Sequence, residues 1–451
     1  MHKVTYFQNV TVAAADGQML LDVSIENRIP HYHQCGGQAR CTTCRVQVLD
    51  GISCVSPRTS LEQQVASRRS WDEFTRLACQ TKVHGDVVIR RLLHNSQDII
   101  VLDLDELSGV AAGEGKELEV AILFSDIRNF TTQCEKSLPH DIVHFLNRYF
   151  AAAAEPVLNN NGFVDKYVGD GILAVFGIRG ESSTSTCQNA VRAALGMQDA
   201  AQRLRPVFEH DFNISIRIGI GIHFGTVILG RIGHPGKRDI TVIGDPVNTA
   251  CRLEDMSKEL DVPILLSDSI VAHLPGALRL RPSTKVQLKG RDEQILLYPC
   301  EGFHRPDHIL LVQSSFDRVA GRLTDFSERF YAILFEANPE LRPLFQHDLT
   351  IQAKMLASML SSLVKGLNRM QEIEGGLRML GKRHRDYKVA RTDYDKVFRA
   401  LLLTLEEFVG DDFTPKTRHA WTAVYGMMAK TMIDAAGAEG IDAAEAEGNG
   451  P

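Results

Sequence analysis

No stretch of the 451-residue sequence reaches the roughly 18 consecutive apolar residues that a membrane-spanning helix requires. Basic residues are not in excess either: 50 lysines and arginines face 56 aspartates and glutamates, which gives a formal net charge of −6. Binders of nucleic acid or of anionic membranes need a basic surface, so the composition argues against both partners. At the start of the chain, in MHKVTYFQNVTV, polar and apolar residues alternate as in a β-strand, and a signal-peptide pattern is lacking. We therefore expect a cytoplasmic protein.

The length and the composition are those of a globular protein with several domains. Hydrophobic residues make up 44% and charged residues 24%, close to ordinary values, and the length favours two to four domains. The order of strand-like and helix-like patterns along the chain predicts its organisation. We expect a strand-rich block over 1–95, a linker over 96–116, a mixed α/β block over 117–302, a helical block over 307–437 and a disordered acidic tail over 438–451.

Cysteines crowd the first block, in the runs CGGQARCTTC and RLACQ. Cys35, Cys41 and Cys44 are separated by five and then two residues, and Cys79 follows 35 positions later. An odd number of cysteines in a cytoplasmic chain indicates metal or redox chemistry rather than disulfides. Three thiolates on a glycine-bearing loop with a distant fourth suit an iron–sulfur cluster. Zinc is the alternative, although the five-residue spacing fits it poorly. Cys54, in a turn-like segment, is interpreted as an ordinary residue.

The cysteine pattern resembles that of the 2Fe–2S ferredoxins, over essentially all of residues 1–95. The spacing is similar to the adrenodoxin-like branch, with Ala39 as a departure where glycine is frequent. The resemblance implies an α+β β-grasp fold and a 2Fe–2S cluster on Cys35, Cys41, Cys44 and Cys79. It also implies electron transfer or redox sensing, with a ferredoxin reductase or another electron donor as partner.

Two aspartates stand at the ends of predicted strands in the mixed block. Asp126 follows the run EVAILF, and Asp170 lies in the GDG turn between FVDKYV and ILAVF. Taken singly, Asp126 suits a helix cap and Asp170 a hairpin turn. Together they can place two carboxylates at the ends of neighbouring strands, as a two-metal site requires. Mg²⁺, or Mn²⁺, is the expected metal, because such ions take few protein carboxylates and complete their shell with water and phosphate.

A second constellation lies in RDITVIGDPVNTACRLE, where Asn248 and Arg252 are four residues apart and share one helix face. An arginine can stabilise charge growing on a phosphoryl group, and an asparagine can hold a ribose or a metal-bound water. A solvated helix face with one salt bridge is the alternative.

In order and spacing, FSDIRNFT, KYVGDG, GIHFG and TVIGDPVNTACRLE resemble the class III nucleotide cyclase domain, over roughly 117–302. The resemblance implies an α/β fold with a ferredoxin-like βαββαβ sheet.

The resemblance also implies roles for single residues. Asp126 and Asp170 are similar to the metal-binding aspartates, and Asn248 and Arg252 to the transition-state pair. Lys289 is similar to the lysine that holds the triphosphate. The implied reaction is attack of the ribose 3′-oxygen on the α-phosphorus, with pyrophosphate leaving. In this family the aspartates and the Asn/Arg pair come from different protomers, so we expect a homodimer with two equivalent sites.

Base recognition depends on three further residues. Lys166 is similar to the lysine that contacts the base, and Thr241 falls where many members have aspartate and a bacterial branch has threonine. A lysine donates to adenine N1 and a threonine hydroxyl can accept from the exocyclic amine, whereas guanine presents a carbonyl and an N1–H there. Asp239 lies close in sequence and is the fallback partner for the amine. The expected substrate is therefore ATP.

The helical block contains three histidines. A histidine on a helix is usually structural, and His347 and His419 are interpreted in that way. His384 lies near a helix end in LGKRHRDYKV, flanked by basic residues, and further upstream FYAILFEANPELRPLF joins an apolar helix to a turn. This block resembles the bacterial globins over nearly all of 309–436. The resemblance implies an all-α fold that binds haem b.

The globin resemblance implies a haem pocket. His384 is similar to the proximal ligand, Phe345 to the phenylalanine that wedges the porphyrin, and Tyr331 and Gln352 to the distal pair that donates hydrogen bonds to bound O₂. Two departures stand out: Lys388 replaces a residue that is often glycine, and Ala436 falls about where flavohaemoglobins have a glutamate. The absence of a flavin block after the globin pattern favours a gas sensor. A globin fold without haem is the alternative.

Together the blocks predict an adenylate cyclase for cAMP signalling, a phosphorus–oxygen lyase regulated by redox state and by O₂ or another diatomic gas. Only ferrous haem binds O₂, so we expect the cluster of the electron-transfer block to keep the haem reduced. The rival is a ferredoxin-fed globin oxidoreductase, similar to an NO dioxygenase, with an inactive cyclase module for dimerisation. The third hypothesis is a pure binding protein, a sensor that catalyses no reaction.

Overall fold

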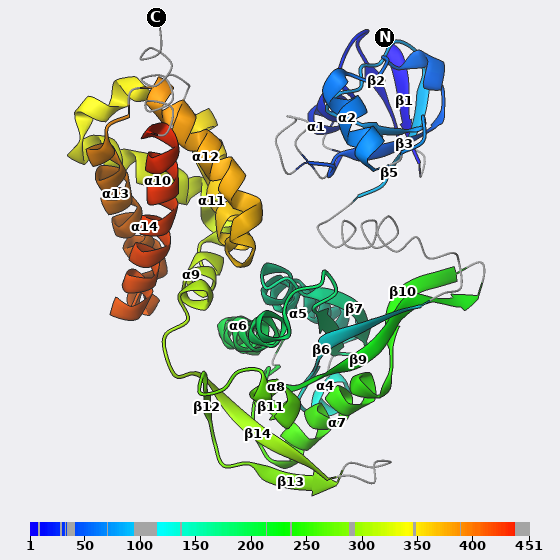
Figure 1. The fold of residues 1–451 in the computed structure, drawn as a ribbon, viewed down its shortest axis with the longest axis vertical. Helices are drawn as coiled ribbons and strands as arrows, with labels where there is room; N and C mark the ends of the chain where they lie inside the picture. Colours follow the sequence, from blue (N-terminus) through cyan, green and yellow to red (C-terminus); the bar gives the residue numbers. More distant parts are fainter. Residues whose placement is uncertain are drawn as a thin grey trace, which may run out of the picture. The chain divides into compact units, whose positions relative to one another are not determined.

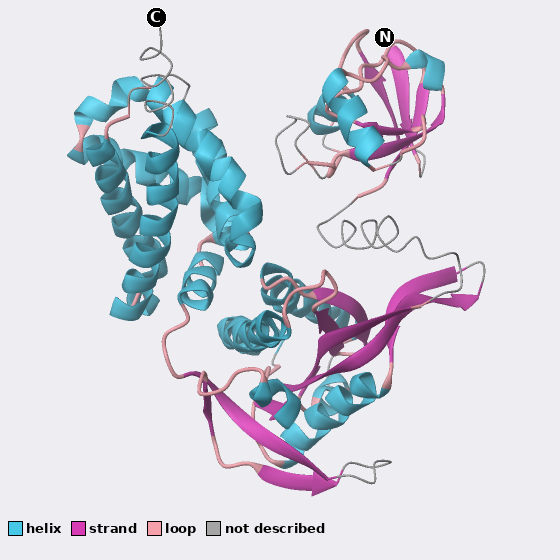
Figure 2. Cartoon of the chain, in the orientation of Figure 1, coloured by secondary structure: helices cyan, strands magenta, loops and turns pink. Residues whose placement is uncertain are grey.

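The structure is a computed structural model whose chain forms two compact units, one of residues 1–116 with 230–240 and one of 117–229 with 241–451. Figures 1 and 2 show the elements of the chain, coloured by sequence and by secondary structure. Most of the predicted linker, together with Cys35, Lys289, His347, Lys388 and the predicted tail, lies outside the described residues. The described residues are 1–7, 10–27, 29–31, 33, 41–69, 71–93, 115–135, 138–212, 214–234, 237–287, 294–345, 349–387 and 389–437.

The N-terminal region is a small mixed sheet with two helices. Its strands run in the order β2-β1-β5-β3-β4, and only the central pair β1–β5 is parallel. Alternate residues of β1 and β5 are buried, among them Val4 and Ile89, because successive strand residues point to opposite faces. The elements are β1 (His2–Tyr6), β2 (Val10–Ala14), α1 (Leu20–Glu26), β3 (Arg45–Asp50), η1 (Ile52–Cys54), α2 (Ser60–Arg68), β4 (Thr75–Leu77) and β5 (Val87–Arg91).

The middle region is a larger sheet whose main path runs β12-β14-β11-β9-β6-β8-β7, with β10 paired to β9 and β13 to β14. Its strands are β6 (Lys116–Ile127), β7 (Phe163–Val168), β8 (Gly171–Phe176), β9 (Ile218–His234), β10 (Lys237–Ile243), β11 (Ile264–Ser267), β12 (Leu278–Leu280), β13 (Thr284–Gln287) and β14 (Gln294–Phe303). Its helices are α4 (Phe130–Cys134), α5 (Pro139–Asn159), α6 (Ser183–Phe212), α7 (Asp245–Glu259) and α8 (Asp268–Ala272).

Helices cover both faces of this sheet, as the alternation along β11 shows. Ile264 and Leu266 belong to a cluster that includes residues of α5 and α6, such as Phe145 and Phe208, whose ring centroids are 4.5 Å apart. Leu265, between them, packs in a second cluster with Leu253 of α7. Strands buried on both faces read as continuous apolar runs, and ILLS and EVAILF are such runs.

The C-terminal region is all-helical. It comprises α9 (His308–Asp317), η2 (Ala320–Arg322), α10 (Leu323–Ala337), η3 (Pro339–Leu344), α11 (Leu349–Lys365), η4 (Leu367–Arg369), α12 (Met370–Asp386), α13 (Arg391–Val409), η5 (Gly410–Asp412) and α14 (Pro415–Gly437). On α10, Phe326, Phe330 and Leu334 recur every four residues and are buried in one core with Trp421 of α14. The side chain of Asp307 caps α9 by accepting a hydrogen bond from the Leu310 N–H at 3.0 Å.

A polar junction joins the helical region to the middle region inside the second unit. The amides of Gln313 and Asn368 both donate to the backbone carbonyl of Asn159, at 3.2 and 2.8 Å. Arg192 of α6 donates to Asp307 Oδ2 at 2.7 Å and to Asn368 Oδ1 at 2.9 Å. The end of α5 and the middle of α6 are therefore fixed to α9 and η4. Within the described part of the chain, no helix is both long and apolar enough to cross a membrane.

Candidate active site

The two aspartates of the mixed block lie next to each other. Asp126 stands near the end of β6, and Asp170 occupies the turn that joins β7 to β8. Ser125 pairs with Ile172 in the antiparallel β6–β8 ladder, so the turn is brought beside Asp126. The backbone N–H of Ile127 donates to Asp170 Oδ2 at 3.2 Å. Burial, then the adjoining Asp126 carboxyl, raises the pKa of Asp170 well above its usual range.

This carboxylate pair fits divalent metal ions. Two negative groups that repel each other strongly enough to raise the Asp170 pKa are neutralised best by a cation between or beside them. No group of three or more potential metal-ligating side chains occurs among the described residues. Two carboxylates nevertheless suffice for Mg²⁺ or Mn²⁺, because water and phosphate oxygens supply the other ligands.

A lysine that sequence reasoning missed contacts one member of this pair, Asp126. The Lys258 ammonium of α7 is 2.8 Å from Asp126 Oδ2 and 3.1 Å from Glu254 Oε2. Burial would lower the pKa of Lys258, but the hydrogen bonds that its ammonium donates to both carboxylates outweigh this effect and raise that pKa. Glu254 is only 2% exposed, and burial raises its pKa to about 7 against the opposing effect of Lys258. The four-residue spacing of Glu254 and Lys258 was visible in the sequence, but their approach to Asp126 was not.

The predicted transition-state pair lies on α7, the helix that also carries Lys258. Asn248 is exposed, whereas Arg252 is half-buried and its Nη1 is buried without a hydrogen-bond partner among the described residues. Within the described part of a single chain, no hydrogen bond or ion pair joins either side chain to Asp126 or Asp170. Arg252 therefore keeps an unused donor that can serve a phosphate oxygen.

The predicted base-binding pair is brought together. Lys166 Nζ of β7 donates to Thr241 Oγ1 of β10 at 2.9 Å, although 75 residues separate them. The Thr241 hydroxyl in turn donates to Asp165 Oδ2 at 2.8 Å, a contact that sequence reasoning missed. Asp239 also lies in β10, but its side chain is not described. Lys289 lies outside the described residues, so its predicted role remains a prediction.

Among the described cysteines of the first block, Cys44 and Cys79 lie next to each other. Cys44 and Cys79 are buried, and a hydrogen bond from Cys79, followed by burial, raises the pKa of the Cys44 thiol. Cys41 Sγ is 2.9 Å from Thr43 Oγ1. Thiols this close fit a cluster, because a bound metal ion replaces their protons. Cys54 lies in η1 against Gly85, whose added Cβ would approach its Sγ to 2.6 Å.

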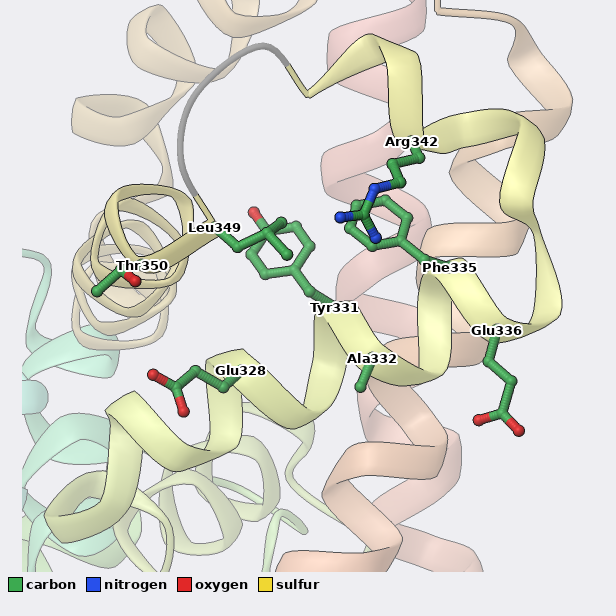
Figure 3. A pocket seen from close by; sticks show the side chains of 8 residues that line it. All are labelled: Glu328, Tyr331, Ala332, Phe335, Glu336, Arg342, Leu349 and Thr350. Atoms are coloured by element: carbon green, nitrogen blue, oxygen red, sulfur yellow. The ribbon is translucent and has the colours of Figure 1, made fainter.

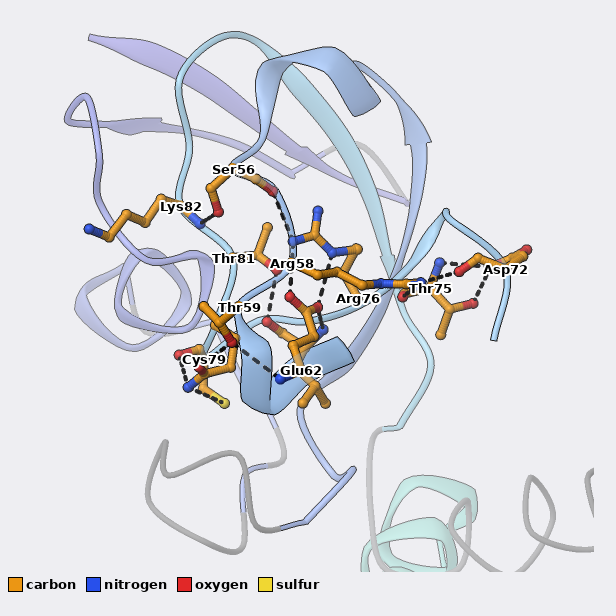
Figure 4. A network of polar contacts seen from close by, with 12 residues as sticks. Ser56, Arg58, Thr59, Glu62, Asp72, Thr75, Arg76, Cys79, Thr81 and Lys82 are labelled. Atoms are coloured by element: carbon orange, nitrogen blue, oxygen red, sulfur yellow. Dashed lines mark hydrogen bonds and ion pairs between the residues drawn. The ribbon is translucent and has the colours of Figure 1, made fainter. Parts of the chain in front are cut away.

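A buried ion pair supports the strand that leads to Cys79 (Figure 4). Arg76 Nε donates to Glu62 Oε1 at 2.9 Å, and the backbone N–H of Leu77 donates to the same oxygen at 2.7 Å. A second nitrogen of Arg76 donates to the Ser56 carbonyl at 2.9 Å. A buried pair of charges is held only when its remaining groups are also bonded, as here. β4 and the cysteine after it are thereby fixed to α2.

A cavity of about 510 Å³ opens at α10 in the helical region (Figure 3). Tyr331 and Phe335 line it, and the Phe345 ring lies 5.4 Å from that of Tyr331. The predicted Tyr331 and Phe345 are thus brought together. The half-buried Gln352 of α11 is not among the residues that line this cavity. The complete lining is Glu328, Tyr331, Ala332, Phe335, Glu336, Arg342, Leu349 and Thr350.

The predicted proximal histidine lies on α12 and does not line that cavity either. His384 Nδ1 is 2.9 Å from the Tyr394 hydroxyl, and burial lowers the pKa of His384. A neutral imidazole held at Nδ1 has Nε2 left for a metal, so the donor chemistry fits haem iron. Tyr394 was missed, because a tyrosine ten residues downstream gives no sequence signal. His419 is exposed, with its ring centroid 5.3 Å from that of His308.

Three segments of the chain match known family models. Residues 6–84 match the 2Fe-2S iron-sulfur cluster binding domain. Residues 114–300 match the adenylate and guanylate cyclase catalytic domain, and residues 328–432 match the globin model.

Individual proteins similar to the chain match its middle region. Over 207 residues it is 36% identical to an adenylate cyclase of Anabaena cylindrica, covering 44% of this chain and 40% of that protein. Over 210 residues it is 32% identical to the terminal-differentiation specific adenylate cyclase of Dictyostelium discoideum, covering 46% of this chain and 10% of that protein. The chain therefore spans less than half of the length of these curated relatives.

Two solved structures are similar as well. The adenylyl cyclase CyaB from P. aeruginosa is 25% identical with a TM-score of 0.40, covering 43% of this chain and 98% of that one. The guanylyl cyclase Cya2 is 27% identical with a TM-score of 0.39, covering 43% and 96%. The three family matches confirm the predicted fold class: the chain carries a 2Fe–2S cluster binding domain, a class III cyclase catalytic domain and a globin domain, in that order.

Proposed function

We propose that this protein is an adenylate cyclase that converts ATP to 3′,5′-cyclic AMP and pyrophosphate. The proposal is carried by one observation: the carboxylate pair Asp126–Asp170 and the hydrogen-bonded pair Lys166–Thr241 both belong to strands or turns of one sheet. The first pair suits metal-assisted phosphoryl chemistry, and the second suits the edge of adenine. Nucleotide cyclisation needs both.

Each residue has a role in the proposed reaction. Asp126 and Asp170 would hold the metal ions, which would lower the pKa of the ribose 3′-hydroxyl and neutralise charge at the α-phosphate. Arg252 donates its unused N–H groups to the phosphate oxygens as negative charge grows on them. Asn248 orients the ribose from the next turn of the same helix. Lys166 donates to N1 of the base.

We propose that the complete site forms between two copies of the chain, since no hydrogen bond or ion pair joins Asn248 or Arg252 to the carboxylates within the described part of one copy. Large apolar side chains near the base-binding pair remain exposed, by 48% at Tyr167, 49% at Val168 and 51% at Ile243. A second copy would cover them and place its own Arg252 opposite the aspartates. Sedimentation of the purified protein is expected to show a dimer.

A cyclic-nucleotide assay tests the activity. The purified chain with Mg²⁺ or Mn²⁺ is expected to form cyclic AMP from ATP, identified by mass spectrometry, and Asp126→Asn is expected to abolish it. Asp268→Asn, at an exposed aspartate of α8 in the same region, is the matched control and should retain activity. ATP binding without a cyclic product in any oxidation state of the haem would refute the proposal.

We further propose that gas binding at the globin haem regulates the cyclase through the polar junction. η4 lies between α11, which carries Gln352, and α12, which carries His384. A haem ligand that displaces either helix also displaces Asn368, whose amide is bonded to the Asn159 carbonyl and, at 2.7 Å, to Asn160 Oδ1. The end of α5 then moves with the globin. Regulation of this kind requires that the ligand favours one of two docked states.

Activity measured with ferrous, oxygenated, carbonylated and ferric protein tests this coupling. Asn368→Ala is expected to reduce the difference between these states while leaving activity in the ligand-free state near the wild-type value. Thr422→Ala, at an exposed position of α14, is the control. An unchanged ligand response in Asn368→Ala would exclude the junction as the route.

We propose that Cys35, Cys41, Cys44 and Cys79 would hold a cluster that would pass electrons from a reductase to the haem. Each transfer would oxidise the reduced cluster by one electron and reduce ferric haem to ferrous haem. Cys79→Ser is expected to slow reduction of ferric haem by an upstream donor, measured from its absorption spectrum. Cys54→Ser, outside the ligand set, should not. Reduction at the wild-type rate in Cys79→Ser would refute the proposal.

A further inference from the structure

The base-binding pair contains a third, deeply buried member. The Asp165 side chain is 0% exposed, whereas that of its neighbour Lys166 is 47% exposed. Asp165 Oδ2 accepts the hydroxyl hydrogen of Thr241 at 2.8 Å and lies 3.2 Å from the Lys166 ammonium. Asp165 Oδ1 is buried and has no hydrogen-bond partner among the described residues. A buried carboxylate with a free oxygen is costly, so its position needs an explanation.

A strand irregularity explains how adjacent residues reach the same threonine. Successive residues of a regular strand point to opposite faces of the sheet. In the β7–β8 ladder, Val164 pairs with Ala174 and Lys166 with Leu173, so Asp165 is an extra residue in β7. Such a bulge re-aims side chains, and bulges are frequent beside active sites. Asp165 and Lys166 therefore both approach Thr241.

The existing hydrogen bonds of the Thr241 hydroxyl determine which hydrogen bond it can still form with a ligand. A hydroxyl has one donor hydrogen and two acceptor lone pairs. The hydrogen is directed to Asp165, and Lys166 donates to one lone pair. A single acceptor site remains. An ionised carboxylate offers no hydrogen in return, so Thr241 cannot turn its own hydrogen away without leaving Asp165 unbonded.

We infer that Asp165 is a positioning residue that fixes Thr241 as a hydrogen-bond acceptor and so selects purines that carry an amino group at position 6. The inference rests on the proposed function and assigns its nucleotide selectivity to a residue that does not touch the base. The amine of adenine donates to the remaining lone pair of Thr241. A carbonyl at position 6, as in guanine or hypoxanthine, meets a second acceptor there and is rejected.

Asp165→Asn tests the inference, because asparagine keeps the shape but can donate to Thr241 and release its hydroxyl hydrogen. The ratio of kcat/KM for ATP to that for GTP is expected to fall about tenfold or more. Purine riboside triphosphate, which lacks the amine, should be affected less than ATP. In a Thr241→Val background, Asp165→Asn should change the ratio no further, since the two act through one hydroxyl.

A purely structural role gives a different result, in which Asp165→Asn lowers turnover of both nucleotides equally. An unchanged ratio in a folded variant, checked by circular dichroism, would overturn the inference. Should Asp165→Asn fail to fold, Asp165→Ser also removes the carboxylate from Thr241 and is expected to lower the ratio. Retention of the wild-type ratio by Asp165→Ser would overturn the inference equally.

Binding of 3′-deoxy-ATP and 3′-deoxy-GTP separates this inference from the proposed function, since neither analogue can be cyclised. Loss of ATP preference in Asp165→Asn binding, in a protein that forms no cyclic product, would support the inference and refute the cyclase. Cyclic AMP formation by a variant whose selectivity is unchanged would support the cyclase and refute the inference about Asp165.

Discussion

The two halves of the candidate site differ in how complete they are within one chain. Asp165, Lys166 and Thr241 are already joined by hydrogen bonds of 2.8 and 2.9 Å. The phosphate-handling groups are not, because Arg252 keeps an unbonded Nη1 and the Lys258 ammonium lies on Asp126. The base-recognition half is preformed, whereas the reactive half is incomplete.

This difference indicates where regulation can act. A preformed recognition half binds the nucleotide at little ordering cost, whatever the state of the dimer. The reactive half depends on docking of a second copy, so a signal that changes docking changes turnover without changing which nucleotide is bound. The following predictions test that separation, from the largest expected effect to the smallest.

Removing a metal ligand should separate turnover from recognition. Asp170→Asn is expected to lower cyclic AMP formation at least about a thousandfold, since metal ions contribute several kcal/mol of charge stabilisation. The ratio of binding constants for 3′-deoxy-ATP and 3′-deoxy-GTP should stay near that of the wild type. Loss of this preference together with turnover would show that the two halves are not separate.

Removing the ammonium beside Asp126 should affect only the reactive half. Lys258→Met is expected to tighten Mn²⁺ binding about fivefold, measured by electron paramagnetic resonance, because a positive charge no longer competes with the metal. Lys396→Met, at an ion-paired lysine of the helical region, is the control. Weaker or unchanged Mn²⁺ binding in Lys258→Met would contradict this account of the lysine.

The buried acid of the reactive half should make stability depend on pH. Burial raises the pKa of Glu254 from an ordinary value of 4.5 to about 7, so the folded chain holds a proton that the unfolded chain releases. Stability from this group is therefore greatest at low pH and is lost as the pH rises from about 4.5 to about 7.

Thermal unfolding at pH 5 and pH 8 measures this effect. Glu254→Gln is expected to reduce the fall in melting temperature between the two values by a few degrees. The exposed Glu259→Gln, on the same helix, serves as the control. An equal fall in wild type and Glu254→Gln would contradict the raised pKa.

Most of the correct predictions from the sequence rested on local patterns of residues. Apolar runs, glycine turns and cysteine spacing indicated the three fold classes, which the family matches confirm. The runs before Asp126 and around Asp170 also placed both aspartates at strand ends. Lys166 and Thr241 meet as the cyclase resemblance implied, but their roles in binding stay predictions.

Contacts between distant segments could not be predicted in this way. Lys258 lies 132 positions from Asp126, and no periodicity relates them. Asp165 looked like any polar strand residue, because the bulge that aims it at Thr241 depends on pairing with β8. Tyr394 contacts His384 only because the chain turns back between the end of α12 and the start of α13. Such contacts follow from tertiary packing, which a single sequence does not encode locally.

Mixing two inactive variants tests the central claim, that the reactive half is assembled from two chains, most directly. Asp126→Ala and Arg252→Ala proteins are each expected to be inactive alone. Subunit exchange at equal amounts should restore about one quarter of wild-type cyclic AMP formation, because half of the dimers are mixed and each holds one intact site. No recovery, under conditions where subunit exchange is demonstrated, would contradict the account.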